Sequence, residues 1–159
     1  MRLDNQPCAG PADAWGLDPL FWVPVKLFVG DLLRALPSDS ASVFFVGNRR
    51  AVRSVELVGI VVSADTRSVK MDTYAIDDGT GVILCVYFAS QDEQSAAPRL
   101  EYDLGDTVRV EGRPVTFRGE RQIVVRNVWR VAPDDEVAGW LERLALRRLL
   151  SAPAESGTS

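Results

Sequence analysis

The amino-acid sequence predicts a mainly β protein: one five-stranded Greek-key barrel with a short N-terminal helix and a C-terminal α-helix. Three observations support this fold class. Short apolar segments recur between residues 43 and 131, and turn sequences such as Asp78-Gly79 separate them. Gly59 lies inside the first long apolar segment, where the closure of a small barrel requires strong bending. Sustained helical periodicity begins only at residue 134.

The composition is that of an ordinary globular domain, and it excludes several functions. The chain has 159 residues, a net charge of −4 and 47% hydrophobic residues, which fits one domain with a sizeable core. It has no histidine, and its two cysteines, Cys8 and Cys85, are far apart. A protein-built zinc site is therefore nearly excluded, and histidine acid–base catalysis and a disulfide framework are excluded. We expect no metal and no cofactor.

The sequence also predicts where the protein resides. No apolar run reaches the roughly 18 residues that a membrane span needs, so no membrane association is expected. The first residues lack a basic start followed by an apolar region, so neither a signal peptide nor a transit peptide is expected. Two separated thiols fit a reducing compartment. We therefore expect a cytoplasmic or nuclear protein.

The N-terminal part is predicted to be irregular. Residues 1–14 are rich in Pro, Ala, Gly and Asp and are expected to be disordered, so that the single domain spans 15–150. Residues 21–28 (FWVPVKLF) favour a short extended segment, and the proline within it suggests a sheet edge. Asp31 is expected to cap one helical turn that ends before Pro37.

Four strands are predicted in the middle of the chain, at residues 43–46, 55–62, 71–76 and 82–88. The segment between the last two, Asp77-Asp78-Gly79-Thr80-Gly81, is predicted to be a hairpin turn. Strand alternation divides residues 82–88 into two faces: Val82, Leu84, Val86 and Phe88 on one, and Ile83, Cys85 and Tyr87 on the other.

A long polar connection at residues 89–103 precedes the remaining strands. These are predicted at 107–111, continuing at 115–117 after Gly112 and Pro114, and at 122–131. A helix capped by Asp134 or Asp135 is predicted over 134–150, followed by a disordered tail at 151–159. Five main strands, a bend glycine and a long connection after the third strand are the pattern of an OB-fold barrel. The alternative is another small barrel or open sheet, such as an SH3-like barrel.

The predicted C-terminal helix has an apolar stripe. At helical spacing the stripe contains Val137, Trp140, Leu141, Leu144, Ala145 and Leu149. Arg143 and Arg147 lie on the other side, and Arg148 narrows the stripe. The stripe has two interpretations, packing on its own barrel or docking to a partner. A barrel that is already closed favours a partner interface.

Several motifs together resemble one known family. They are WGLDP at residues 15–19, VELVG at 55–59, IDDGTGVI at 76–83, GDTVRVEG at 105–112 and FRGER at 117–121. The set resembles the N-terminal OB domain of the Stn-type subunit of CST, the telomere-associated complex that binds single-stranded DNA. It is similar, more loosely, to the middle subunit of replication protein A. The resemblance covers residues 15–150, and its most specific parts are WGLDP, IDDGTGVI and FRGER.

The resemblance implies a nuclear protein of chromosome telomeres. Such subunits form a heterodimer with a small Ten-type OB subunit through the C-terminal helix and join a large DNA-binding CST subunit. They protect chromosome ends, limit telomerase and assist DNA polymerase alpha–primase in lagging-strand fill-in. Alternatives are a replication-protein-A-like middle subunit in general DNA replication and repair, or an interaction scaffold without nucleic-acid contact. No enzyme is expected.

Candidate DNA-binding residues are aromatic side chains for base stacking and basic side chains for phosphates. They are Phe117, Arg118, Arg121, Phe88, Tyr74, Tyr87 and Lys70. In the replication-protein relatives, two aromatic residues near the positions of Phe88 and Phe117 stack on bases. The alternatives are that Phe88 belongs to the core, in phase with Val82, and that the arginines lie on a solvated turn.

Charge is unevenly distributed. Six arginines and two acids lie between residues 109 and 130, which gives this window a charge of +4 in an acidic chain. Because the whole chain is acidic, DNA binding by this chain alone is predicted to be weak and salt-sensitive. Asp77 and Asp78 are explained by turn chemistry rather than catalysis, and Cys85 is expected to be a buried small residue.

Overall fold

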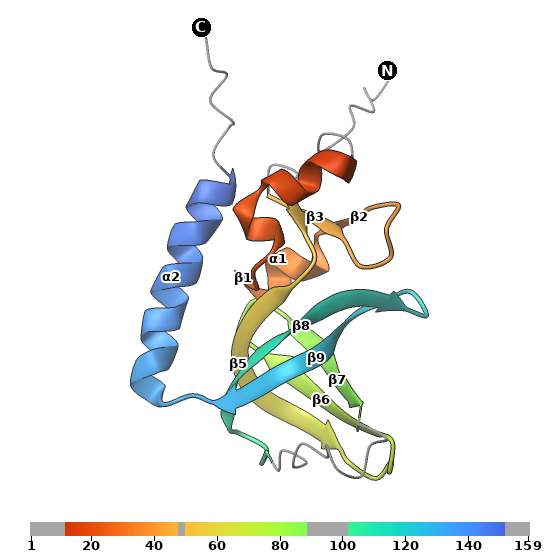
Figure 1. Ribbon diagram of the computed structural model, residues 1–159. Coiled ribbons are helices and arrows are strands. Elements are labelled where there is room, and N and C mark those ends of the chain that lie inside the picture. The colour runs from red at the N-terminus through yellow and green to blue at the C-terminus, as the bar shows by residue number, and fades with distance from the viewer. Residues whose placement is uncertain (1–11, 48–49, 89–101, 152–159) are drawn as a thin grey trace, which may run out of the picture.

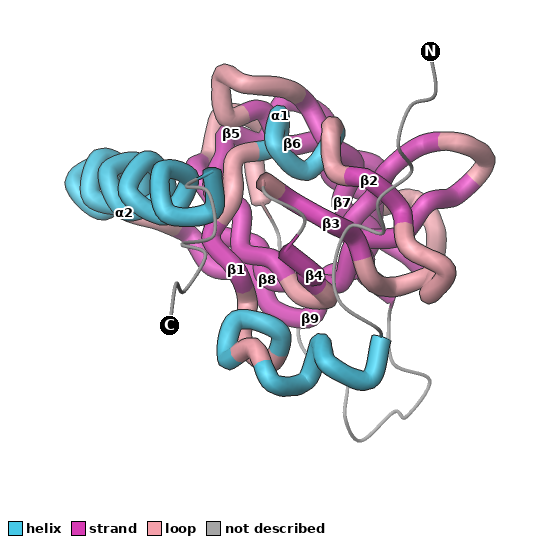
Figure 2. Tube along the Cα trace, turned by 90° about the horizontal axis from the view of Figure 1, so that it is seen from above, coloured by secondary structure: helices cyan, strands magenta, loops and turns pink. Residues whose placement is uncertain are grey.

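The computed structural model describes residues 12–47, 50–88 and 102–151. Five long strands form a closed barrel (Figure 1), and they are β5 (Val55–Asp65), β6 (Met71–Asp77), β7 (Val82–Phe88), β8 (Thr107–Phe117) and β9 (Glu120–Arg130). Their order is β5-β6-β7-β9-β8, and β8 pairs with β5 to close the barrel. β7 and β9 are parallel, and the other barrel pairs are antiparallel. The predicted Greek-key OB fold is confirmed, and Figure 2 shows the molecule from above, with α2 beside the strands.

The core is formed by the inward faces of these strands. Its fully buried members include Leu57, Ile76, Ile83, Val108, Val110 and Ile123. Gly59 allows the first two strands to approach closely, because a Cβ atom there would lie 2.3 Å from Cγ2 of Ile76. The bulge in β5 lies between Val61 and Ser63 instead. β8 runs through Gly112 and Pro114 as one strand with a register shift, so the predicted interruption is wrong.

An N-terminal arm covers one end of the barrel. It contains two 3-10 helices, η1 (Ala12–Leu17) and η2 (Pro19–Phe21), and a small sheet of β2 (Leu36–Pro37), β3 (Phe44–Val46) and β4 (Arg50–Val52). Trp15 packs edge-on against Phe45 at a ring distance of 5.7 Å, and Asp18 accepts a hydrogen bond from Leu20 N. The WGLDP motif is therefore structural. Residues 12–14, expected to be disordered, belong to η1, and residues 1–11 lie outside the described part.

The remaining short elements differ from the sequence predictions in detail. Within residues 21–28 only β1 (Val25–Lys26) is a strand, and it pairs in parallel with the start of β5. The helical turn is α1 (Val29–Leu33), and Asp31 is not its cap. Asp78 Oδ2 accepts from Val29 N at 2.8 Å, and Thr80 Oγ1 accepts from Gly30 N at 2.9 Å. The Asp-Asp-Gly-Thr turn therefore caps a helix some 50 residues earlier in the chain.

The C-terminal helix α2 (Pro133–Ser151) lies along the outside of the barrel (Figures 1 and 2). Acidic residues occupy its first turn and Arg148 its last, which suits the helix dipole. Ser151, predicted to begin the disordered tail, is the last helical residue, and residues 152–159 lie outside the described part. None of the described helices is long and apolar enough to cross a membrane.

Candidate functional site

A groove of about 530 Å³ lies on the outer surface of the barrel. It is bounded by α1, by the outer faces of β6 and β7, and by the β8–β9 hairpin. Its lining residues are Leu33, Ala75, Val82, Leu84, Thr116, Gly119, Glu120 and Arg121. β6 and β7 are the second and third barrel strands, whose outer face is the usual oligonucleotide surface of OB folds. The groove is therefore the candidate nucleic-acid interface.

The two best aromatic candidates are exposed on this side of the barrel. Phe117 is 54% exposed at the hairpin, and Phe88 is 56% exposed on the same face of β7 as the groove residues Val82 and Leu84. The alternative that Phe88 belongs to the core is therefore wrong. Exposed rings of this kind can stack on bases of any identity.

The hairpin turn fixes the position of Arg118. Arg118 and Gly119 both have positive φ, +51° and +81°, as a two-residue type I′ turn requires. The guanidinium of Arg118 lies over the ring of Phe117, 5.1 Å from its centroid. An exposed cation and an exposed ring are therefore paired at the rim of the groove, which suits contact with a phosphate and its neighbouring base.

Two tyrosines predicted to bind DNA face the barrel interior instead. Tyr74 is only 7% exposed, and its ring packs edge-on against Tyr102 at 5.9 Å. Tyr87 is half-buried and lines a small internal cavity with Tyr74 and Cys85. Strand alternation places residues 83, 85 and 87 inward, so neither tyrosine is available for stacking in the groove.

Arg121 lines the groove, but its charged group is held by the protein. Its Nη1 donates to the carbonyl oxygens of Leu32 at 2.8 Å and Ala35 at 2.9 Å, and its guanidinium lies 4.1 Å from the centroid of Phe44. Desolvation lowers the pKa of Arg121. Arg121 thereby joins the hairpin to the end of α1, and its contact with a phosphate stays a prediction.

The loop before β6 forms the other end of this surface. Lys70 is exposed there, as predicted, and its backbone N–H donates to Ser68 Oγ. A small surface pocket nearby is lined by Asp65 and Arg67 among others. Arg67 donates to Asp65 at 2.7 Å and lowers the pKa of that carboxyl to about 2 through this hydrogen bond. The positive charge of Arg67 is therefore partly neutralised by Asp65, whereas Lys70 does not line this pocket.

The arginine-rich window does not form one continuous basic patch. Arg109 lies 3.5 Å from Glu56, and Arg130 lies 3.2 Å from Asp106. Arg130 is exposed but paired, and Arg121 is held, so Arg113, Arg118 and Arg126 are the exposed arginines of the window that form no ion pair with a described acid. Three dispersed charges give a weaker phosphate attraction than six aligned ones.

The second candidate surface is α2, which docks on the barrel through one narrow face. Arg143 is buried at 2% exposure and donates to Leu27 O at 3.2 Å and to Glu56 Oε1 at 3.2 Å. Leu150 is buried against the arm, and a Cβ atom on Gly47 would lie only 2.6 Å from its carbonyl oxygen. The sequence predicted Arg143 on the polar side of the helix, but that side faces the barrel.

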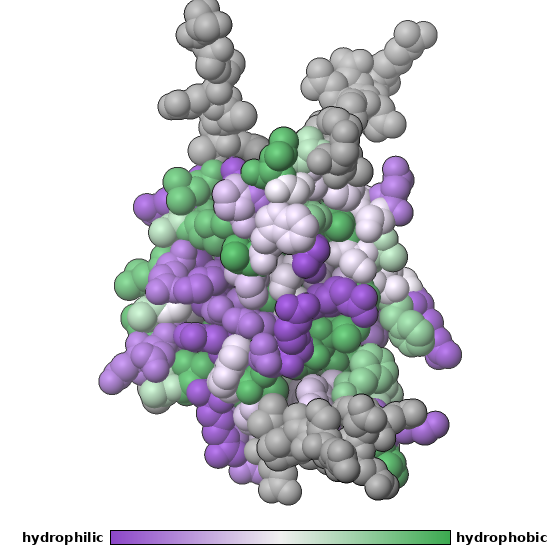
Figure 3. Space-filling model, viewed as in Figure 1, coloured by the Kyte–Doolittle hydropathy of each residue, from purple (hydrophilic) through white to green (hydrophobic). Residues whose placement is uncertain are grey.

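The opposite face of α2 is apolar and exposed. Among its predicted interface residues Val137 is 63%, Leu141 63%, Leu144 36% and Leu149 70% exposed, and Ala145 is also exposed. Trp140 is 38% exposed and packs edge-on against Phe28 at a ring distance of 4.8 Å. The alternative that the stripe packs on its own barrel is therefore wrong except for part of Trp140. Figure 3 shows hydrophobic residues interspersed with charged ones along the edge where α2 lies.

Several groove residues were not named by sequence reasoning. Thr116 and Glu120 flank the hairpin turn, and Leu33 comes from α1. Alternation in β8 and β9 could have indicated the first two. Leu33 had no local signal, because its place beside β7 depends on distant contacts such as the turn at residues 77–81 that caps α1.

Other chemistry is limited. Among the described residues, no three His, Cys, Asp or Glu side chains gather into a set able to hold a metal ion. Cys85 is buried at 1% exposure, as predicted, and burial raises the pKa of its thiol.

These features define a class: an OB-fold protein with an outer groove flanked by exposed aromatic rings and an apolar helix face that the described chain leaves uncovered. Residues 29–159 match the family model described as telomere regulation protein Stn1. The chain belongs to the Stn1 family, which confirms the resemblance of its motifs.

Individual relatives agree with this assignment. The chain is 30% identical to the CST complex subunit STN1 of Ailuropoda melanoleuca, over 91% of this chain and 44% of that protein. It is 33% identical to the CST complex subunit STN1 of Arabidopsis thaliana, over 76% of this chain and 87% of that protein. The chain thus spans less than half the length of the mammalian relative and most of the plant one.

A solved structure shares the fold. The structure described as the S. pombe Stn1–Ten1 complex contains a chain that superposes with a TM-score of 0.71 at 20% identity, covering 80% of this chain and 93% of that chain. At this identity the likeness shows the OB fold.

Proposed function

We propose that this chain is a non-enzymatic subunit of a CST-type complex at nuclear telomeres. In this proposal α2 pairs with a small Ten-type OB subunit, and the groove makes auxiliary contact with single-stranded telomeric DNA held mainly by a large DNA-binding subunit. Membership of the Stn1 family supports the proposal, as do relatives named as CST complex subunits and a similar chain solved together with Ten1.

The observation that carries the proposal is the orientation of α2. The helix is anchored by a buried arginine on one face and presents Leu141 and Leu144 on the other. A monomeric protein gains nothing from this arrangement, because the apolar face contributes no burial. A second apolar helix or barrel would bury it, which is the helix-in-groove form of recognition.

The groove has properties suited to an auxiliary DNA contact rather than a primary one. Phe117, Arg118 and Phe88 can stack on bases and meet phosphates. The few unpaired cations limit affinity, so the contact acts in the assembled complex. End protection and lagging-strand fill-in with DNA polymerase alpha–primase are the activities in which we place the complex.

Family membership favours this function over a replication-protein-A-like middle subunit. A scaffold without nucleic-acid contact is the other alternative. Crosslinking of Phe117 to single-stranded DNA in the assembled complex distinguishes the proposed CST subunit from such a scaffold, because a scaffold gives no such crosslink.

The partner interface is tested by co-expression with the Ten-type protein of the same organism. Leu144→Asp should abolish co-purification, because a carboxylate cannot be buried without a partner. Val62→Asp is the matched control, since Val62 is a similarly exposed apolar residue on β5, away from α2. Circular dichroism should show that both variants remain folded. Co-purification of Leu144→Asp at wild-type levels, or its unfolding while Val62→Asp stays folded, would contradict the interface.

The DNA contact is tested in the same complex with a fluorescent telomeric oligonucleotide. Phe117→Ala should weaken binding by roughly fivefold or more, since stacking contributes about 1–3 kcal/mol per base. Trp129→Ala is the control, because Trp129 is a comparably exposed ring that does not line the groove. Equal effects of the two variants, or nanomolar binding by the isolated chain in physiological salt, would contradict the proposed role.

A further inference from the structure

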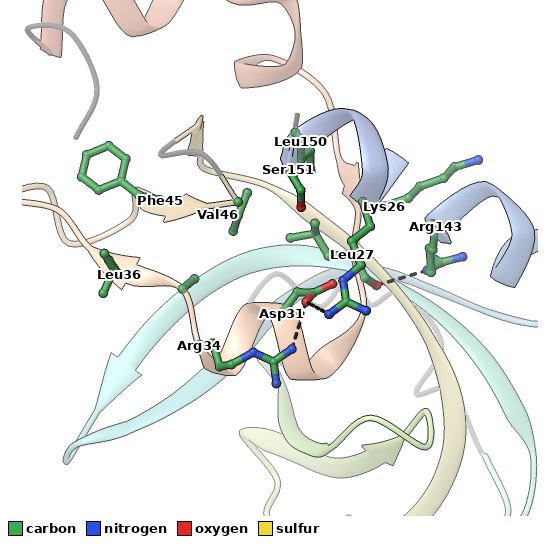
Figure 4. Close-up of a pocket in the computed structure, with 13 residues that line it drawn as sticks. Lys26, Leu27, Asp31, Arg34, Leu36, Phe45, Val46, Arg143, Leu150 and Ser151 are labelled. Carbon is green, nitrogen blue, oxygen red and sulfur yellow. Dashed lines mark hydrogen bonds and ion pairs between the residues drawn. The ribbon is translucent and has the colours of Figure 1, made fainter. Parts of the chain in front are cut away.

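A cleft of about 390 Å³ lies on the barrel-facing side of α2, apart from the DNA groove and the apolar helix face. Figure 4 shows its three walls. The first wall is formed by the segment from β1 to the end of α1 and contains Lys26, Leu27, Asp31 and Arg34. The second is formed by β2 and β3 and contains Leu36, Phe45 and Val46. The third is formed by α2 and contains Arg143, Arg147, Leu150 and Ser151. This volume is within the range of sites that bind small ligands or a few side chains.

Two guanidinium groups share one carboxylate at the mouth of the cleft. Asp31 Oδ1 lies 3.0 Å from Arg34 Nη2 and 3.3 Å from Arg147 Nη2. The side chains of Arg34 and Arg147 are 66% and 50% exposed, whereas that of Asp31 is 19% exposed. Each guanidinium has further N–H donors, so the pair can accept a second carboxylate.

The other charges around the cleft are paired. Lys26 pairs with Glu142, and Arg143 pairs with the buried Glu56. Arg34 and Arg147 instead share the single carboxylate of Asp31, which leaves one positive charge in excess at this pair. This balance matches a ligand with a single anionic group.

The wall opposite α2 is apolar and partly open. Leu36 is 55% exposed, Phe45 beside it is half-buried and Val46 is buried, and Leu150 on the α2 wall is buried as well. An apolar side chain entering beside Leu36 would cover surface that the described chain leaves exposed.

We propose that this cleft binds an acidic–hydrophobic peptide segment of a partner protein. One Asp or Glu carboxylate bridges Arg34 and Arg147, and an adjacent bulky apolar side chain packs on Leu36 and Phe45. A nucleic-acid strand fits less well, because it carries one phosphate charge per nucleotide and the cleft offers one excess cation beside the carboxylate of Asp31.

The proposal goes beyond the DNA groove and the partner face of α2 and does not depend on either. Arg143 and Leu150, which border the cleft, lie on the docked side of α2, whereas Leu141 and Leu144 lie on the exposed side. A peptide in the cleft and a small OB subunit on the helix face can therefore bind at the same time.

The test is a titration of the isotope-labelled full chain with a short synthetic peptide that places Glu next to Leu and Phe in a Gly–Ser frame, followed by NMR. Amide shifts should be concentrated at residues 34–36, 45–47 and 147–151. Arg34→Glu should weaken binding about tenfold or more, since it removes one charge-assisted contact and adds repulsion. Arg126→Glu, an exposed charge reversal on β9, is the matched control and should have no effect.

Further arms of the experiment distinguish the other occupants. A peptide with Gln in place of Glu should bind at least about fivefold more weakly, and oligo-dT should shift groove residues rather than the cleft. The proposal is overturned if no cleft shifts appear at millimolar peptide, if Arg34→Glu and Arg126→Glu bind equally, if the Gln peptide binds as well, or if oligo-dT shifts the cleft instead.

Discussion

Replacing Arg143 by methionine tests how α2 is attached to the barrel. The Arg143 side chain is 2% exposed and the Glu56 side chain 8% exposed, with 3.2 Å between Nη2 and Oε1. The same guanidinium donates to the carbonyl oxygens of Leu27 at 3.2 Å and Gly139 at 3.0 Å. Methionine keeps the length of the side chain but leaves Glu56 and these carbonyls without that donor.

The expected loss in the free energy of unfolding is about 3–5 kcal/mol, the usual cost of removing one partner of a buried ion pair. Because Arg109 stays 3.5 Å from Glu56 and compensates part of its charge, we expect the lower half of that range. For a domain of this size, the loss corresponds to a drop in Tm of roughly 6–16 °C.

Urea denaturation followed by circular dichroism measures this loss. Arg148→Met is the control, because Arg148 is exposed on the same helix, and its loss should stay within about 0.5 kcal/mol. Adding Glu56→Gln to Arg143→Met removes the uncompensated carboxylate, so the double variant should be less destabilised than the sum of the single ones. A loss below about 1 kcal/mol for Arg143→Met, or simple additivity, would refute the view that this pair fixes the helix.

Two further predictions concern the capping turn and the buried thiol. Asp78→Ala should lower the free energy of unfolding by about 1–2 kcal/mol, because Val29 N loses its acceptor. Asp77→Ala should cost less, because Asp77 accepts only from Gly79 N in an exposed turn. Equal urea midpoints of the two variants would contradict this prediction. In a variant with Cys8→Ser, Cys85 should react with a thiol reagent only as fast as the chain unfolds. Burial raises the pKa of the Cys85 thiol and blocks access of the reagent. Rapid labelling of Cys85 in the native protein would contradict this prediction.

Sequence patterns predicted the barrel well because they report local geometry. Alternation in residues 82–88 correctly separated the buried Ile83 and Cys85 from the exposed Val82 and Phe88. The turn at Asp78-Gly79 also lies where predicted. These properties depend on neighbours within a few residues, which the sequence displays directly.

The destinations of polar side chains were not predictable in the same way. Asp78 caps a helix 49 residues away, and Arg121 reaches carbonyl oxygens 86 and 89 residues away. Both residues looked like ordinary turn residues, because an arginine or aspartate in a turn is usually solvated. Only the closed barrel brings α1 beside these turns, so the partners follow from topology rather than from spacing.

The helix α2 shows why this distinction matters for function. Its periodicity correctly grouped Val137, Leu141 and Leu144, but periodicity alone does not say which face meets the barrel. The usual assumption places the apolar side inward. Here Arg143 pairs with Glu56 on β5 and Leu150 is buried, so this side of the helix faces the barrel and the apolar side faces solvent. Replacing Glu56 should therefore loosen the attachment of α2 and change how the proposed partner face is held, although Glu56 lies on the barrel rather than on that face.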